Sequence, residues 1–457
     1  MYRVRSNNNI IRDVSGTLTT TIFSGLTNGT TYTFTVQAIN SVGASIASSP
    51  SNPVTLISLS LAQATLELVT PNLDTTFPDT QFGSTLEISK DGNVICVTNS
   101  NIGNSPYIRI YRYNTSNATW NNEKTITTSF NETHGFPFET LSEVGWGRTL
   151  AVSGNGNYIG IGNDSSTRFF PNGGLVEVYQ YNVSTQLWSR DSWVNSILAL
   201  RYNATGPAPT ILDAKWGSSI SFNYTGNVCA IFSNWNINIY KQTNNVWMLT
   251  SFISGAAELG KSISLSNNGN ILVSSIQYGA KTYIESSANT WSEFPLPQIL
   301  FTHNSLLSAN VKISQDGTTI IIGVEFFTGS LNRQGAVKVY RFISNSWTKI
   351  GRDLLGPAAL SFFGSAVSIS NTGNIIAIGA FRFNSLRGAV YGYGYNSAAD
   401  DWDLIFSIAG QNTTDRLGFV NTLCITSDAT KLVLGVPYTG NGSVRIYNVA
   451  YDSSVIP

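Results

Sequence analysis

The sequence has few charged residues and few side chains suited to acid–base or metal chemistry. Only 11% of its 457 residues are charged, and 26 Lys and Arg balance 26 Asp and Glu. A neutral chain lacks the positive field that draws proteins to nucleic acid, so nucleic acid is not an expected partner. Two His and three Cys offer little for zinc or thiol chemistry. We therefore expect a protein that is not an enzyme, with no catalytic residues, no metal and no cofactor.

Long apolar runs and a disulfide framework are also missing. No stretch approaches the ~18 to 20 apolar residues of a membrane span, so no membrane insertion is expected. The first sixteen residues, MYRVRSNNNIIRDVSG, lack the apolar core of a signal peptide. Cys96, Cys229 and Cys424 each lie in an apolar, strand-like run, which predicts buried small hydrophobic side chains rather than reactive thiols.

The amino-terminal residues read as β-hairpins. Two runs of alternating apolar and polar residues are joined by a turn at Asn28 and Gly29 and closed by a Ser/Pro stretch. GLTNGTTYTFTV (25–36) and AINSVGAS (38–45) resemble the second half of a fibronectin type III domain, which implies such a module over residues 1–56. The resemblance begins near Tyr2–Ser6 and lacks that family's first two strands.

A sandwich without two strands exposes apolar faces and open edges. Three explanations are open: an upstream start of the reading frame, completion by a neighbouring chain through strand addition at Tyr2–Ser6, or a partly disordered remnant.

The rest of the chain repeats one unit seven times. Each unit has an aromatic residue or Leu, then Gly and a small residue, an alternating strand, a turn with Gly, an apolar strand, a loop, a strand ending in Tyr, and Trp. Long connections between units are expected from Asn121 to Gly145 and from Ser189 to Lys215. In five copies the first Gly precedes the turn Gly by nine residues. The copies begin at Phe82, Trp146, Trp216, Leu259, Leu307, Phe363 and Leu417.

Four short strands per unit and no helical period predict an all-β fold, a seven-bladed β-propeller over residues 57–457. The seventh unit has no Trp strand after it, whereas an unassigned strand, Ala64–Val69, precedes the first unit. We therefore expect Ala64–Val69 to complete the last blade and close the ring by a strand swap, which removes exposed edges.

Phe363, Gly364, Gly379 and Ala380 stand where the FG-GAP propeller of integrin alpha chains has its FG and GAP motifs. The repeats resemble that family, which implies its propeller fold and a role outside a cell or on a virion. The corresponding turns, such as SNTGN, are too short and too poor in carboxylates to wrap calcium, so a calcium site is not carried over.

Repeated Trp and Tyr side chains are expected to pack between blades rather than bind sugar. The irregular loops after the second strands are the expected binding sites, because they combine aromatic residues with arginine. Packing beneath the loops remains the alternative for these side chains. The candidate binding residues are Arg168, Phe169, Phe170, Trp235, Phe326, Phe327, Arg333, Phe381, Arg382, Phe383, Arg387 and Tyr438.

Taken together, the sequence predicts a non-enzymatic surface or structural protein for adhesion, receptor contact or assembly of an outer layer. Its expected partner is a protein or a surface glycan, and its expected location is extracellular, on a cell surface or on a virion. A carbohydrate-binding lectin propeller is the first alternative. A hydrolase or lyase acting on glycans is the second, with acids brought together around the propeller axis.

Overall fold

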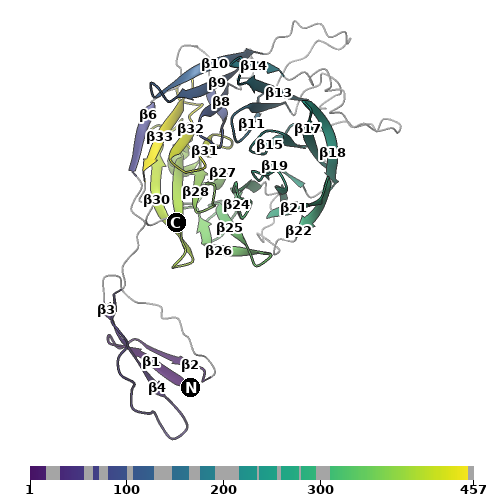
Figure 1. Cartoon of the computed structure of the whole chain (residues 1–457). Helices are drawn as coiled ribbons and strands as arrows, with labels where there is room; N and C mark the ends of the chain where they lie inside the picture. The colour runs from purple at the N-terminus through teal and green to yellow at the C-terminus, as the bar shows by residue number, and fades with distance from the viewer. Residues whose placement is uncertain are drawn as a thin grey trace. The chain divides into compact units, whose positions relative to one another are not determined.

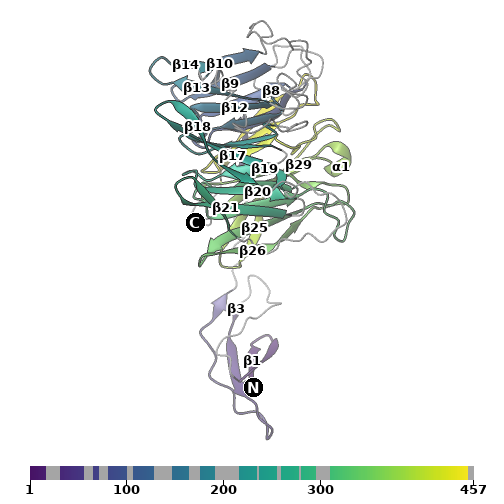
Figure 2. The same ribbon diagram turned by 90° about the vertical axis from the view of Figure 1, so that its right-hand side faces the viewer.

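The computed structural model describes residues 1–16, 31–55, 65–70, 81–99, 107–127, 147–163, 175–190, 216–233, 236–254, 259–276, 279–294 and 309–450. Within these ranges the regular structure is β-strand with one four-residue helical segment, α1 (Phe383–Leu386) (Figures 1 and 2). The all-β prediction is confirmed. α1 was not predicted, because Asn384 and Ser385 have φ of 51° and 58° and the segment is a tight turn without helical periodicity.

The chain divides into two compact units, Met1–Ala62 and Gln63–Pro457. In the first unit, β1 pairs with β2 on one side and with β4 on the other. The expected open edge at Tyr2–Ser6 is therefore wrong, because the chain turns back at Asn9 (φ 61°) and lays β2 along β1. The strands of this unit are β1 (Tyr2–Ser6), β2 (Ile11–Val14), β3 (Thr31–Tyr32), β4 (Phe34–Ala38) and β5 (Val54–Thr55).

The described part of the second unit holds seven four-stranded antiparallel sheets, six of them made of consecutive strands (Figure 1). The first three sheets are β7 (Phe82–Ile88), β8 (Val94–Asn99), β9 (Tyr107–Asn114), β10 (Thr119–Thr127); β11 (Thr149–Val152), β12 (Tyr158–Asn163), β13 (Leu175–Asn182), β14 (Leu187–Arg190); and β15 (Ser219–Phe222), β16 (Val228–Phe232), β17 (Asn236–Thr243), β18 (Val246–Ser254). The next three are β19 (Leu259–Leu265), β20 (Ile271–Ile276), β21 (Gly279–Ser287), β22 (Thr290–Phe294); β23 (Ala309–Ile313), β24 (Thr319–Val324), β25 (Ala336–Ile343), β26 (Ser346–Leu355); and β27 (Phe363–Ile369), β28 (Ile375–Ala380), β29 (Ala389–Asn396), β30 (Asp401–Ala409).

The seventh sheet contains strands that are far apart in the sequence. β33 lies between β32 and β6, with Tyr447 opposite Leu68 and Ala450 opposite Thr65. Its members are β31 (Leu423–Ile425), β32 (Lys431–Gly435), β33 (Val444–Ala450) and β6 (Thr65–Thr70).

The repeated turn between the first and second strands is held by its own side chains. The Oγ of Ser314 accepts the N–H of Thr319 at 2.9 Å, and a carboxylate oxygen of Asp316 accepts the N–H of Thr318 at 2.9 Å. Gly317 follows with φ of 76°, a conformation that glycine adopts without steric cost. The short Ser-x-Asp/Asn-Gly pattern thus specifies a tight hairpin locally.

Two strand boundaries differ from the sequence prediction. The repeated tyrosines were expected to end the third strands, but β9 continues three residues beyond Tyr111 to Asn114. The connection expected from Asn121 belongs to strand as far as Thr127, because β10 pairs with β9 along its whole length. A bulge between Asn122 and Lys124 breaks the regular alternation that a longer strand would show in the sequence.

The repeated tryptophans pack against the ring of an aromatic residue on the third strand. Trp402 and Tyr395 lie 5.2 Å apart with an interplanar angle of 53°, and Trp402 is completely buried. The same pairing occurs in other sheets, at Trp120 with Tyr113, Trp188 with Tyr181 and Trp347 with Phe342.

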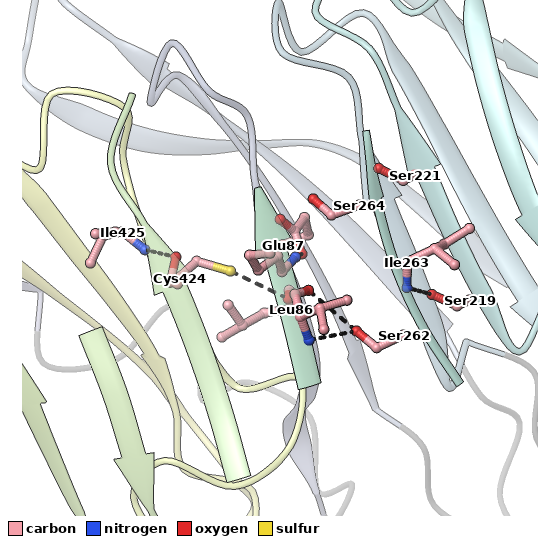
Figure 3. Close-up of polar contacts among 12 residues, drawn as sticks. Leu86, Glu87, Ser219, Ser221, Ser262, Ile263, Ser264, Cys424 and Ile425 are labelled. Carbon is pink, nitrogen blue, oxygen red and sulfur yellow. Dashed lines mark hydrogen bonds and ion pairs between the residues drawn. The ribbon is translucent and has the colours of Figure 1, made fainter. Parts of the chain in front are cut away.

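Neighbouring sheets are joined through their first strands. The Oγ of Ser219 on β15 accepts the N–H of Ile263 on β19 at 3.2 Å (Figure 3). The Oγ of Ser368 on β27 accepts the N–H of Ile425 on β31 at 3.0 Å. These small polar side chains lie at alternate positions of the first strands, and therefore on one face of each strand. Their hydrogen bonds fix each first strand against the next.

Candidate interaction surface on the loop face

Eight of the twelve predicted binding residues lie in the described part of the chain. They come from three loops that connect the second and third strands of their sheets: β24 to β25, β28 to β29, and β32 to β33. Arg168, Phe169, Phe170 and Trp235 lie outside the described residues.

These loops, together with the connections that enter β27 and β31, build a continuous line of five aromatic rings, which we call the aromatic row. Each ring meets the next edge to face, with centroid distances from 5.0 to 5.9 Å. Such geometry places the positive edge of one ring against the negative face of the next. In order, the row is Phe326, Phe362, Phe381, Phe419 and Tyr438.

Three arginines lie over the aromatic row. The guanidinium of Arg382 is 4.8 Å from the ring centroid of Phe362, and that of Arg416 is 4.4 Å from the centroid of Tyr438. Arg333 lies 5.9 Å from the ring of Phe326. Arginine over an aromatic face is attracted by the ring quadrupole while its donors stay available to a partner.

Backbone hydrogen bonds hold the row in place. Phe362 has φ of 56°, in the left-handed region, and its N–H donates to the carbonyl of Arg333 at 3.3 Å. The next residue, Phe363, forms a parallel bridge with Gly335. A bulky residue in this conformation is sterically costly, and such residues concentrate at functional sites. The left-handed backbone at Phe362 places its ring between Phe326 and Phe381, which belong to the loops of two sheets.

A carboxylate joins the other end of the row to its neighbouring loop. Asp415 is fully buried, and its Oδ1 accepts the hydroxyl of Thr439 at 2.6 Å. Its Oδ2 accepts the N–H groups of Gln411 and Asn412. Burial opposes the charge, but these hydrogen bonds outweigh it and lower the pKa of Asp415. The charge of Asp415 is therefore satisfied within the fold.

Glu325 lies directly before the aromatic row and is 9% exposed. Burial raises the pKa of its carboxyl to about 7, and the positive charge of Arg382 only partly opposes this rise. Between pH 4.5, its ordinary pKa, and about 7, the folded protein thus binds more protons at this group than the unfolded chain. The free energy of unfolding must fall as the pH rises through this range.

Glu325→Gln should remove the loss of stability that ionisation of the buried Glu325 carboxyl causes. We expect the variant to be more stable than the wild type by ~1 to 3 kcal/mol at pH 8 and to differ little at pH 4, because the neutral form is already favoured there. Urea unfolding at both pH values measures the difference. Glu293→Gln, whose parent side chain is 50% exposed, is the matched control and should show no such pH dependence. An equal effect of Glu325→Gln at both pH values would contradict this assignment.

The structure separates the predicted residues into two groups. Phe326, Arg333, Phe381, Arg382 and Tyr438 come together in or over the aromatic row. Three others lie outside it: Phe327 packs on a hydrophobic core, Phe383 packs on Tyr391 with 6.3 Å between ring centroids, and Arg387 is exposed.

Sequence reasoning missed Phe362, Phe419, Arg416 and Glu325. The first three belong to connections entering the next sheet, in SFFG (361–364) and RLGFV (416–420). The available signal was one aromatic residue more than the repeat requires: Phe362 before Phe363–Gly364, and Phe419 after Leu417–Gly418. Glu325 offered none, because its burial depends on the folded loop.

Metal-binding side chains do not gather in the described residues. No cluster of three His, Cys, Asp or Glu side chains that could hold a metal is found among them. The three thiols are buried as expected, and burial raises their pKa, to about 12 for Cys424. In the same residues, no helix has the length and apolar character needed to cross a bilayer.

Comparisons with known proteins support both parts of the fold. Residues 1–55 match the model of the fibronectin type III domain. No curated protein matches the sequence. Among solved structures, the β-propeller domain of Cps50 (Swd1) from Myceliophteria thermophila is 8% identical, with a TM-score of 0.53 over 84% of this chain and all of that chain.

Two further structures have a TM-score of 0.49. U3-55K is 13% identical over 84% of this chain and 98% of that chain. The periplasmic gluconolactonase PpgL of Pseudomonas aeruginosa is 10% identical over 91% of this chain and 95% of that chain. By the family match and the Cps50 likeness, the chain carries a fibronectin type III domain at residues 1–55 followed by a propeller-like all-β fold.

Proposed function

We propose that the seven sheets are the blades of one closed FG-GAP-like propeller. Contacts between glycines of neighbouring sheets support this. A Cβ on Gly379, of the GAP-like motif, would lie 2.3 Å from the carbonyl oxygen of Gly418 in the next sheet, and one on Gly435 would lie 2.1 Å from that of Gly83. The GAP-like glycine of one blade and the first-strand glycine of the next blade would thus form the two sides of one close contact.

The turns between first and second strands support a closed ring as well. Backbone hydrogen bonds connect each of these turns to the next, and the last connects back to the first: the N–H of Ser427 donates to the carbonyl of Lys90 at 3.3 Å. The pairing of β33 with β6 supplies the outer strand of the last blade. Closure would leave no sheet edge free to pair with other chains.

On this ring we propose a non-enzymatic surface or structural function: adhesion, receptor contact or assembly of an outer layer, outside a cell or on a virion. The observation that carries the proposal is the aromatic row with its three arginines, spanning three neighbouring sheets on one loop face. Aromatic residues and arginine dominate the energetic centres of protein interfaces. The loops are fixed by backbone bonds, so binding would cost little ordering entropy.

A protein partner fits this surface better than a glycan. Sugar recognition by stacking needs an open aromatic face, whereas Phe362 is only 3% exposed and lies beneath Arg382. Guanidinium groups above the rings are instead placed to pair with carboxylates of a partner. A strand-addition partner of the first unit could not pair with β1, because β1 is already paired on both sides.

Peptide display and a glycan array together test this function. We expect the full chain to select a family of peptides from a random library, and Arg382→Ala to weaken their binding by at least about tenfold. Arg352→Ala is the matched control, because Arg352 belongs to β26 and pairs with Asp401 instead of the row. Equal binding by both variants would overturn the assignment of the row. Selective glycan binding that Arg382→Ala abolishes would favour the lectin alternative.

A further inference from the structure

The first strands of the sheets surround a polar interior that the proposed partner surface does not use. Each first strand contacts the first strand of the next sheet, and β31 also contacts β7. At one level of these strands, equivalent positions of the repeat hold Glu87, Ala151, Ser221, Ser264, Lys312, Ser368 and Cys424. We call these residues the axial ring; it rests on the closed propeller proposed above.

An ion pair crosses the interior of the axial ring. The Nζ of Lys312 on β23 lies 3.4 Å from the Oε2 of Glu87 on β7. These strands belong to the fifth and first sheets, which are not neighbours. The two side chains therefore meet inside the ring and not along its wall. The Glu87 carboxylate outweighs the effect of burial and raises the pKa of Lys312.

Protein surrounds this pair, but both side chains remain partly exposed. The Lys312 side chain is 32% exposed and that of Glu87 is 19% exposed, and burial has the largest single effect on the pKa of Lys312. Charge interactions in such surroundings are stronger than in bulk water. A small ion that reached the pair would therefore be held more strongly than at an open surface.

A second lysine supplies an unbalanced positive charge. Lys90 follows β7, and its ammonium group makes no hydrogen bond or ion pair with any described residue. The carbonyl of Lys90 accepts the hydroxyl of Ser427, and the Oγ of Ser427 accepts the side-chain amide of Gln315, three residues after Lys312, so hydrogen bonds link the two lysine-bearing segments inside the ring. Burial lowers the pKa of Lys90, and the charge of Lys312 lowers it further, while Glu87 and Cys424 raise it. One carboxylate thus faces two ammonium groups.

Hydroxyl groups add donors to the same ring. The Oγ atoms of Ser221, Ser264 and Ser368 each accept an N–H from the neighbouring first strand. No acceptor among the described residues takes the hydrogen of these hydroxyls. Each hydroxyl oxygen has two lone pairs and the backbone N–H uses one, so each of these side chains keeps its O–H as a donor. Three hydroxyl donors thus accompany the two ammonium groups of the axial ring.

We propose that the axial ring binds a small anion, of the size of a halide, between Lys90 and Lys312 with axial hydroxyl groups as further donors. The anion supplies the negative charge that Glu87 alone does not provide. It would reduce the repulsion between the ammonium groups and tie together first strands of different sheets. The site is independent of the aromatic row, because it lies on the first strands and not on the loops.

Bromide is the probe. In crystals of the full chain soaked in sodium bromide, we expect an anomalous peak within hydrogen-bond distance of Lys90 and Lys312. In solution, bromide titrated at constant ionic strength against fluoride should raise the unfolding temperature of the wild type. Lys90→Met should lose the peak and weaken the bromide response by at least about tenfold, the loss expected for a charge-assisted hydrogen bond.

Two further variants separate this site from general salt effects. Glu87→Gln removes the competing carboxylate and should strengthen the bromide response. Lys349→Met is the matched control, because Lys349 lies on β26 and pairs with Asp353 at 2.7 Å. No axial peak in the wild type would overturn the proposal. So would an equal bromide response in wild type and Lys90→Met. Failure of the peptide-binding experiment would leave both of these results unaffected.

Discussion

Gly335→Ala is expected to destabilise the protein by ~3 to 5 kcal/mol, because this glycine lies where two neighbouring sheets touch. Its φ is 78°, and a Cβ there would lie 2.0 Å from the carbonyl oxygen of Phe363. The backbone fixes the position of the Cβ, and the oxygen that it meets is itself a backbone atom, so no side-chain rotation can relieve the contact. The parallel bridge between Gly335 and Phe363 would have to open. Urea unfolding of the full chain measures the loss.

Gly440→Ala is the control for the backbone conformation alone. Gly440 also has a positive φ, 60°, but a Cβ there meets no atom within 4 Å. We expect this substitution to cost only ~1 kcal/mol, the penalty for alanine in the left-handed region. If both variants lost the same stability, the contact between sheets would contribute nothing and this account of the glycine would fail.

Replacing β6 should have the second large effect. Exchanging Thr65–Thr70 for a Gly/Ser segment of equal length removes the strand that pairs with β33. We expect the free energy of unfolding of the second unit to fall by at least ~3 kcal/mol, and the chain to self-associate through the edge that β33 then exposes. Urea unfolding and light scattering report these two results.

The same replacement at β5 provides the comparison. Val54–Thr55 pairs with β3 in the first unit, so exchanging it should leave the unfolding of the second unit unchanged. A β6 replacement that behaved like the β5 replacement would show that β6 does not complete the last sheet.

Local patterns made much of the second unit predictable. Its hairpin turns depend on residues within six positions of each other, as at Ser314, Asp316 and Gly317. The spacing of such turns determined where first and second strands lie. The ends of the third strands were less predictable, because polar residues after Tyr111 continue in the strand through pairing with β10.

The candidate surface was predictable only in part, because it joins residues from different sheets. Phe326 and Phe381 follow second strands and were recognisable as loop aromatics. Phe362 connects them only because the chain adopts a left-handed conformation there and Phe363 bridges to Gly335. Such contacts between sheets are not encoded in the period of the repeat. The pairing of β1 on both sides was missed for the same reason, since strand order is not visible in a single strand's pattern.

Amide hydrogen exchange along β33 tests the central claim, a closed ring that fixes the loop face, most directly. If β33 lies between β32 and β6, the amides of its residues 446–450, which β6 pairs, should be protected throughout. Their exchange should match that of Ala389–Asn396 in β29, which has strands on both sides. Rapid exchange at alternate β33 amides, as in an edge strand, would contradict closure and the surface derived from it.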